Sequence, residues 1–190
     1  FYSQIGQGNT SDAEFISNTS LYPRERGGIG TDYIGIEYPS LPRLLKKEGY
    51  TSMTFHPNTI TFWNRDNLYP CLGFDRYYAK EYYQNEDRLG PWGSSDEVLF
   101  KKALPVLIDY QQNNQKFYAS LIALTNHHPF ILPENRKHLN LPPQLEGTSV
   151  GNYLTSANYQ DYALGQFIED LKSNNLWNNT IFAVFGDHYG

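Results

Sequence analysis

The chain ends in a segment whose residue types suit metal binding. Asp187 and His188 stand next to each other directly after the apolar run Thr180–Phe185. The run is short and rich in β-branched and aromatic residues, which predicts a strand buried on both faces of a parallel sheet. Because neighbouring strand residues point to opposite faces, the two side chains can share one ion only where the strand has ended, and Gly186 supplies backbone freedom there. The alternative is a solvated loop in which Asp187 caps a turn and His188 packs on a tyrosine.

A second segment contains a candidate nucleophile, Thr10. Two glycines, Gly6 and Gly8, precede it, and Ser11 with Glu14 three residues later forms a capping-box pattern. A helix should begin at about Ser11, with Thr10 at its mouth, where free N–H groups and the positive end of the helix dipole favour an alkoxide or a phosphate. Metal coordination would activate the threonine hydroxyl. The alternative is that Thr10 only helps to cap the helix.

Two further segments carry groups suited to a phosphate ester. In the first, Arg65 offers a planar fork for phosphate oxygens, Trp63 offers an indole donor and an apolar wall for a small polyol, and His56 is a hydroxyl partner. In the second, His127 follows a buried strand and could donate to a phosphate oxygen or exchange a proton with a hydroxyl. Structural alternatives are a core position for Trp63 and an ion pair of Arg65 with a nearby acid such as Asp66.

Alternating helices and strands must position these groups. The capping, proline and periodicity signals predict three helices, over residues 40–49, from Ser94 to about Asn113 with a bend at Pro105, and from about Val150 to Asn174. The last of these should turn Leu154 and Phe167 toward the sheet. Strands are expected at Tyr50–Phe55, Lys116–Leu124 and Thr180–Phe185. The βαβ pattern predicts an α/β fold with a largely parallel sheet flanked by helices, whose ligands bind outside the carboxyl ends of the strands.

Composition is that of a globular domain. The 190 residues are 39% hydrophobic and carry a net charge of -5 without a cluster of basic residues, so nucleic acid is not expected as a partner. Cys71 is the only cysteine, which excludes an internal disulfide. The apolar stretches are shorter than a membrane-spanning helix needs. Two stretches, Tyr69–Trp92 and Pro129–Thr148, are expected to be surface excursions near the pocket.

The hexapeptide Phe185-Gly186-Asp187-His188-Tyr189-Gly190 resembles the metal-binding strand end of lipoteichoic acid synthases and related phosphoglycerol transferases. These enzymes belong to the alkaline phosphatase and sulfatase superfamily. The family also carries a nucleophile segment, a tryptophan-arginine segment and a histidine segment in the order seen here. The resemblance implies one partial sulfatase-like catalytic domain over residues 1–190, truncated at both ends. It implies Thr10 as nucleophile and metal ligand, Asp187 and His188 as further ligands, and a substrate pocket formed by Trp63, Arg65, His127 and His56.

The resemblance also implies a mechanism. Thr10 would attack the phosphorus of a phosphatidylglycerol-like lipid, diacylglycerol would leave, and an acceptor hydroxyl or water would release the glycerophosphate. The mixed ligand set and the family favour Mn²⁺, with Mg²⁺ or Zn²⁺ possible. A glutamate that completes the metal site in the family has no match in this chain, so the chain alone is expected to bind metal weakly and turn over slowly. The intact protein is expected at the extracytoplasmic face of the membrane, tethered through segments outside this chain.

Two departures from the family leave more than one reaction compatible with the sequence. Asn9 stands where the synthases have a lysine, and Asn58 stands where they have an aspartate near the substrate glycerol. A phosphoethanolamine transferase or a phosphodiesterase of the same superfamily therefore remains an alternative, as does an inactive module that binds glycans or lipid head groups. A sulfatase is disfavoured, because Thr10 cannot supply the formylglycine that such an enzyme uses.

Overall fold

A computed structural model describes residues 9–23, 28–32 and 34–188. Its sheet consists of β1 (Tyr50–Phe55), β2 (Arg76–Tyr78) and β3 (Lys116–Leu121), which are all parallel and lie in the order β2-β1-β3. In the register, Met53 of the central strand lies opposite Arg76 and Ala119. The predicted parallel α/β architecture is confirmed.

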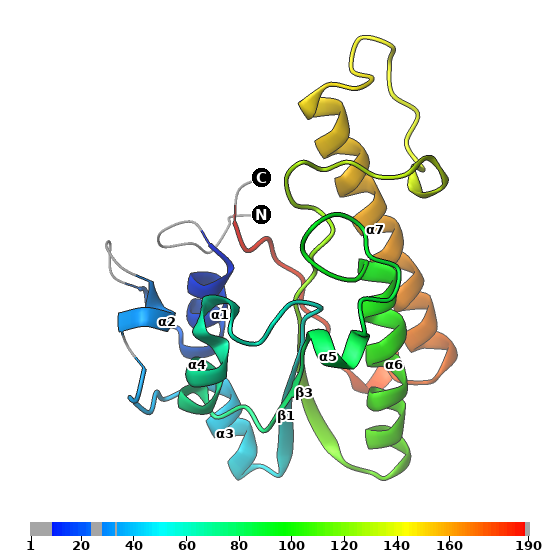
Figure 1. Ribbon diagram of the computed structural model, residues 1–190. Helices are drawn as coiled ribbons and strands as arrows, with labels where there is room; N and C mark the ends of the chain where they lie inside the picture. The colour runs from blue at the N-terminus through cyan, green and yellow to red at the C-terminus, as the bar shows by residue number, and fades with distance from the viewer. Residues whose placement is uncertain (1–8, 24–27, 33, 189–190) are drawn as a thin grey trace.

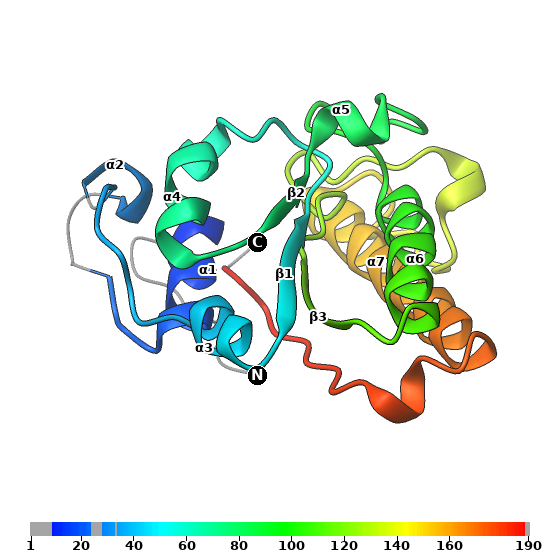
Figure 2. The same ribbon diagram turned by 90° about the horizontal axis from the view of Figure 1, so that it is seen from below.

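Helices cover both faces of the sheet. They are α1 (Thr10–Thr19), α2 (Ile29–Asp32), α3 (Leu41–Lys47), α4 (Arg65–Leu72), α5 (Lys80–Tyr83), α6 (Asp96–Gln112) and α7 (Ser149–Ser173), with 3₁₀ turns at Phe62–Asn64, Glu134–Arg136 and Trp177–Asn179. Helices α6 and α7 lie on one side of the strands, and α1, α3 and α4 lie on the other (Figures 1 and 2). Each side has its own core. The core under α6 and α7 includes Phe55, Leu99, Leu107 and Phe167, and the core under α1 and α4 includes Phe15, Leu68 and Leu72.

Local signals explain the helix that leads into β1. The Ser40 side chain accepts a hydrogen bond from the Arg43 N–H and caps α3, whose first turn contains Pro42. Gly49 ends this unit with a positive φ of 81°, a conformation that glycine adopts without steric cost. Strand β1 then begins at Tyr50, as predicted.

Helix α6 differs from the prediction at its start. Its N-cap is Ser95, whose side chain accepts from the Val98 N–H at 3.3 Å, and not Ser94. Glu97, three residues after Ser94, binds Arg136 and accepts a hydrogen bond from the Tyr159 hydroxyl at 2.8 Å. The helix continues through Pro105 as one element.

Three predictions about the remaining elements are wrong. Residues 180–185 form no strand, and Ile181 is fully exposed, because an apolar run specifies no partner strand by itself. Leu154 is exposed, since the first half of α7 extends beyond the sheet (Figure 1) and only its later residues, such as Phe167, pack on the core. The stretch 69–92 is not an excursion throughout, because it contains the edge strand β2.

No helix within the described parts of the chain is both long and apolar enough to cross a membrane.

Candidate active site

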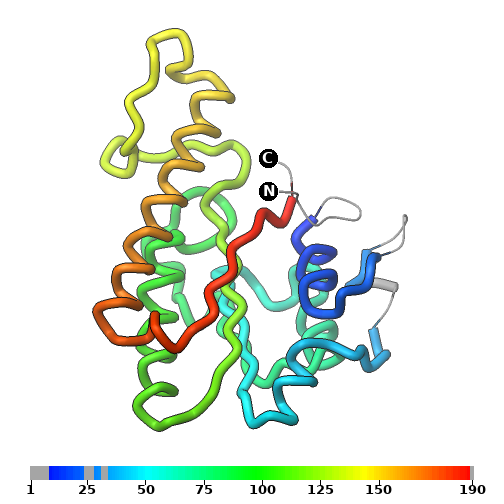
Figure 3. The backbone as a smooth tube through the Cα atoms, turned by 180° about the vertical axis from the view of Figure 1, so that it is seen from behind, coloured from blue at the N-terminus to red at the C-terminus, as the bar shows by residue number. Residues whose placement is uncertain are grey.

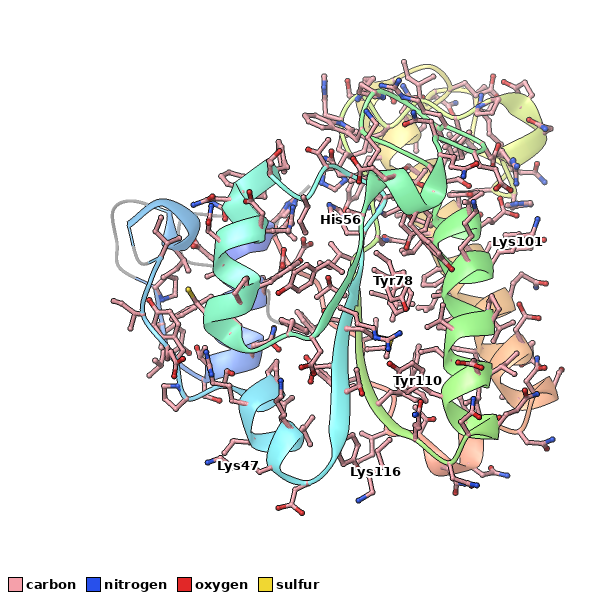
Figure 4. All side chains as sticks on the ribbon, turned by 60° about the horizontal axis from the view of Figure 1, so that its bottom comes forward. Lys47, His56, Tyr78, Lys101, Tyr110 and Lys116 are labelled. Atoms are coloured by element: carbon pink, nitrogen blue, oxygen red, sulfur yellow. The ribbon has the colours of Figure 1, made fainter. Side chains whose placement is uncertain are left out.

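The candidate residues gather at the carboxyl ends of the strands. His56 directly follows β1 (Figure 4), and His127 lies in the segment that follows β3. The C-terminal segment runs past the sheet and ends beside the start of α1, so that residues near position 10 and residues near position 187 meet at this end (Figures 1 and 3). Gly6, Gly8 and the last two residues of the C-terminal hexapeptide lie outside the described residues.

Thr10 occupies the first turn of α1. The N-cap is Asn9, whose side-chain oxygen accepts from the Asp12 N–H at 3.2 Å, so the predicted capping box of Ser11 with Glu14 does not form. Asn9 is as strong a cap as serine and stands at the position where the helical backbone begins. Thr10 is only 8% exposed. As the first residue of α1, it lies at the positive end of the helix dipole.

Glu14 is used elsewhere, in a buried pair with Arg65. The Glu14 Oε1 atom accepts from Nη2 of Arg65 at 2.6 Å and from its Nε at 2.9 Å. The Tyr69 hydroxyl donates to Glu14 Oε2 at 2.6 Å. All three residues are at least 94% buried, so the acid that pairs with Arg65 is Glu14 and not Asp66. The Arg65 guanidinium points at α1 in this structure and not into an open pocket.

Burial and charge shift the titration of this cluster. Burial works to lower the pKa of the Arg65 guanidinium, but the Glu14 carboxylate more than offsets this, so the pKa is raised. Burial first, and then the negative charge of Glu14, raise the pKa of the Tyr69 hydroxyl well above its usual value. Arg65 is therefore positively charged and Tyr69 is neutral at physiological pH.

His56 lies beneath the site as a neutral residue. Its ring Nδ1 lies 3.0 Å from the Ile122 carbonyl oxygen. Because a carbonyl only accepts, Nδ1 carries the proton in this tautomer. Burial, followed by the positive charge of Arg65, lowers the pKa of His56 from 6.5 to about 3. His56 is 7% exposed and shares a small cavity of about 10 Å³ with Asn58 and Arg65, a volume that holds at most about one water molecule.

A row of aromatic rings connects the other candidate residues. It runs from Trp63 through Phe62 and Trp92 to His127 and His188, with successive ring centroids 5.3, 6.2, 6.2 and 5.5 Å apart. Trp63 is 39% exposed, so it is not a core residue. Its φ of 57° turns it away from the helical path of the preceding residues. The row thus links three of the predicted site residues, which are Trp63, His127 and His188.

His127 has a defined orientation. Its Nδ1 lies 2.8 Å from the Leu124 carbonyl oxygen, which assigns the proton to Nδ1 and leaves Nε2 for the site. The buried carboxylate of Asp96 holds the same stretch of chain, since Asp96 Oδ1 accepts from the N–H groups of Leu124 and Thr125 at 2.7 and 3.1 Å. Burial raises the pKa of Asp96, and these two N–H groups oppose the shift.

A pocket of about 200 Å³ adjoins His127. Its wall is mainly apolar and comes from two loops; the lining residues are Leu89, Gly90, Pro91, Trp92, Thr125, His127, Pro129, Ile131 and Leu132. The pocket gives room for a small organic group next to Nε2 of the histidine.

Asp187 and His188 contact each other. The Asp187 Oδ1 atom accepts from the His188 N–H at 3.0 Å, and Asp187 Oδ2 lies 3.7 Å from His188 Nε2. Among the described residues, no group of three or more His, Cys, Asp and Glu side chains could hold a metal ion. A third donor from this part of the chain would be a hydroxyl, and the start of α1 with Thr10 lies beside this segment. One carboxylate, one imidazole and one hydroxyl fit Mn²⁺ or Zn²⁺ better than Ca²⁺.

Sequence reasoning did not identify Glu14, Trp92 or Asp96 as parts of the site. Trp92 had a signal, because it stands in a short loop of glycine and proline just before α6. The roles of Glu14 and Asp96 depend on partners 51 and 28 positions away, and no local pattern encodes these contacts.

Comparisons with known proteins agree with the fold. The family described as Sulfatase matches residues 1–190. The chain is 41% identical to lipoteichoic acid synthase 2 of Bacillus subtilis and 38% identical to lipoteichoic acid synthase of Staphylococcus aureus; each alignment covers 100% of this chain and 29% of the relative. The crystal structure of the lipoteichoic acid synthase LtaP from Listeria monocytogenes superposes with a TM-score of 0.90 at 41% identity, over 93% of this chain and 43% of that one. The chain therefore belongs to the sulfatase family.

Proposed function

We propose that the protein of which this chain forms the catalytic part is a phosphoglycerol transferase that works through a covalent intermediate on Thr10. The observation that carries the proposal is the meeting of the start of α1 with the Asp187-His188 segment and His127 at the carboxyl ends of the strands. The similarity to proteins named lipoteichoic acid synthases supports the choice of reaction. The chain spans 29% of the length of these relatives, so the activity is proposed for the longer protein.

In the first step, the Thr10 oxygen attacks the phosphorus of a phosphatidylglycerol-like lipid. The bond from phosphorus to the diacylglycerol oxygen breaks, and the leaving oxygen takes the Nε2 proton of His127, which enters this step as an imidazolium protonated on both ring nitrogens. The threonine proton passes to water. The first-turn N–H groups of α1 face the developing negative charge on the phosphate oxygens, so they stabilise the transition state.

In the second step, an acceptor hydroxyl attacks the same phosphorus from the opposite side of Thr10. Nε2 of His127 takes the hydroxyl proton, which restores the imidazolium, and the bond from phosphorus to the Thr10 oxygen breaks while that oxygen takes a proton back from water. The Nδ1 contact with Leu124 keeps the ring in one orientation during both transfers. The pocket beside His127 and the exposed ring of Trp63 offer room and an apolar wall for the glycerol and the acceptor.

Thr10, Asp187 and His188 are the residues that would hold a divalent ion, with Mn²⁺ preferred and Mg²⁺ or Zn²⁺ possible. Such an ion supplies activation of the hydroxyl and neutralisation of phosphate charge. Calorimetric titration of the chain with Mn²⁺ tests this assignment. We expect weak binding that Asp187→Asn abolishes, and unchanged binding in that variant would remove Asp187 from the ligand set.

The anionic head group and the acceptor hydroxyl are the proposed partners, and the outer face of the cell membrane is the proposed location of the longer protein. Activity on a fluorescent phosphatidylglycerol tests the covalent mechanism. In the full-length enzyme, Thr10→Ala should abolish release of diacylglycerol, whereas Thr10→Ser should keep part of it because a hydroxyl remains. Full activity of Thr10→Ala would refute the mechanism.

A related head group is the second candidate. Asn58 lies in the small cavity with His56, is buried, and accepts from the Thr59 N–H through its side-chain oxygen at 2.7 Å. It adds no negative charge there, so it would accept hydrogen bonds from a glycerol head group less strongly than a carboxylate. Transfer from phosphatidylethanolamine in preference to phosphatidylglycerol would support this candidate, and turnover of neither lipid would support an inactive binding module.

A further inference from the structure

We infer that Glu14 is a positioning residue for the transfer reaction, because its carboxylate fixes the helix that carries Thr10 against the loop that carries Trp63. This inference rests on the proposed function and names a residue that acts through its neighbours. Glu14 does not touch the reacting atoms itself.

The first argument is the spacing along α1. Thr10, Glu14 and Asn18 are four residues apart, so they lie on one face of the helix, about 6 Å from one to the next along its axis. All three are buried. The Asn18 side-chain oxygen accepts from the hydroxyl of Tyr118 in β3 at 2.9 Å. Through Asn18, two turns after Thr10, this face of α1 is hydrogen-bonded to the sheet. Through Glu14, one turn after Thr10, it is bonded to α4.

The second argument is the set of bonds that meet at Arg65. The guanidinium donates twice to Glu14 Oε1, and its Nη1 donates to the Phe62 carbonyl oxygen at 3.2 Å. Phe62 lies next to Trp63 in the aromatic row, and both belong to the 3₁₀ turn that directly precedes α4. A shift of the Glu14 carboxylate would therefore move two parts of the site at once, the start of α1 and the loop with Trp63.

The third argument concerns energy. A buried ion pair loses the hydration of both groups, so well-packed apolar residues would stabilise this core equally well or better. The core beside it contains the apolar residues Phe15, Leu68 and Leu72. Stability alone does not account for a buried carboxylate, guanidinium and phenol in contact. The direction of the hydrogen bonds does account for these buried polar groups. The Arg65 guanidinium bonds the Glu14 carboxylate at fixed angles and so sets the distance and rotation between α4 and α1.

The test uses Glu14→Asp in the full-length enzyme. Aspartate keeps the negative charge but is one methylene shorter. The ion pair with Arg65 can then persist only if α1 shifts or if the bond to the guanidinium lengthens. We expect kcat for diacylglycerol release to fall about tenfold to a hundredfold, since small misplacements of reacting groups have effects of this size. The KM for the lipid should stay within about twofold, because the substrate contacts are not removed.

A matched control separates positioning from stability. Leu107→Ala creates a cavity in the core under α6 and α7, whereas the Glu14 cluster adjoins the core under α1 and α4. Thermal unfolding is measured for both variants. Glu14→Asp should lose more activity than Leu107→Ala at an equal or smaller loss of Tm. Equal kcat values in the two variants would overturn the inference.

Tyr69→Phe provides a second variant if Glu14→Asp does not fold. It removes only the hydroxyl that donates to Glu14 Oε2 and leaves the ring in the core. We expect about a threefold fall in kcat with an unchanged KM. Unchanged kcat in Tyr69→Phe, or wild-type kcat in a folded Glu14→Asp, would refute the inference and leave the proposed function standing. A wild-type enzyme that transfers no glycerophosphate would refute the proposed function and the inference with it.

Discussion

Acidification should destabilise the fold through His56. The folded protein lowers the pKa of this residue from 6.5 to about 3, mainly because burial disfavours the charged ring. Between these two values the unfolded chain binds a proton that the folded chain does not. The free energy of unfolding therefore decreases as the pH falls through this window, and the contribution of His56 is fully present only above about pH 6.5.

The size of the effect follows from the two pKa values. Between about pH 7 and about pH 5, a group with these values reduces the free energy of unfolding by about 2 kcal/mol. His56→Gln keeps a side-chain N–H that can donate to the Ile122 carbonyl oxygen but does not titrate. Carboxylates elsewhere contribute equally to both proteins, so the difference between them isolates His56.

Urea unfolding at the two pH values, followed by circular dichroism, provides the measurement. We expect the wild type to lose about 2 kcal/mol more than His56→Gln on acidification. Equal losses in the two proteins would show that His56 titrates normally, and the description of a buried neutral imidazole beneath the site would then be wrong.

Substitutions at three positions near His127 should separate stability from activity. Gly93→Ala should destabilise the chain by about 1–3 kcal/mol in urea unfolding, because its Cβ would collide with the Pro57 carbonyl oxygen. Asp96→Ala should lose about 3 kcal/mol, since two buried N–H groups lose their acceptor, while Asp96→Asn should lose less. Trp92→Ala should leave stability nearly unchanged, because the ring is 40% exposed, but should lower kcat/KM of the full-length enzyme about tenfold through its contact with His127. Normal stability of Gly93→Ala or Asp96→Ala, or normal kcat/KM of Trp92→Ala, would contradict the packing described here.

Local signals predicted the central part of the fold. The serine cap, the proline and the glycine around α3 act within a few residues of each other, and β1 follows them at the expected position. The parallel sheet follows from strands that alternate with helices. Residues 180–185 failed as a strand because strand formation needs a neighbour, which a single apolar run does not specify.

Residue types at the ends of elements located the candidate site, but the roles of Thr10, Asp187 and His188 rest on the family resemblance and stay predictions. Thr10 at the start of a helix, and an acid next to a histidine at the end of the chain, are recognisable in sequence, and the fold brings their segments together. Glu14 was misread because the capping-box pattern is local, whereas Arg65 lies 51 positions away and forms a stronger, charge-assisted bond. The same contact explains why Arg65, expected at the substrate, lies buried against α1.

The central claim is that glycerophosphate passes through Thr10. Its most direct test is mass-spectrometric mapping of the full-length enzyme, quenched with acid shortly after mixing with the lipid donor in the absence of an acceptor. We predict a peptide that carries one glycerophosphate on Thr10, and loss of that adduct when an acceptor hydroxyl is added before the quench. Release of diacylglycerol with Thr10 unmodified, or with the adduct on another residue, would contradict the account.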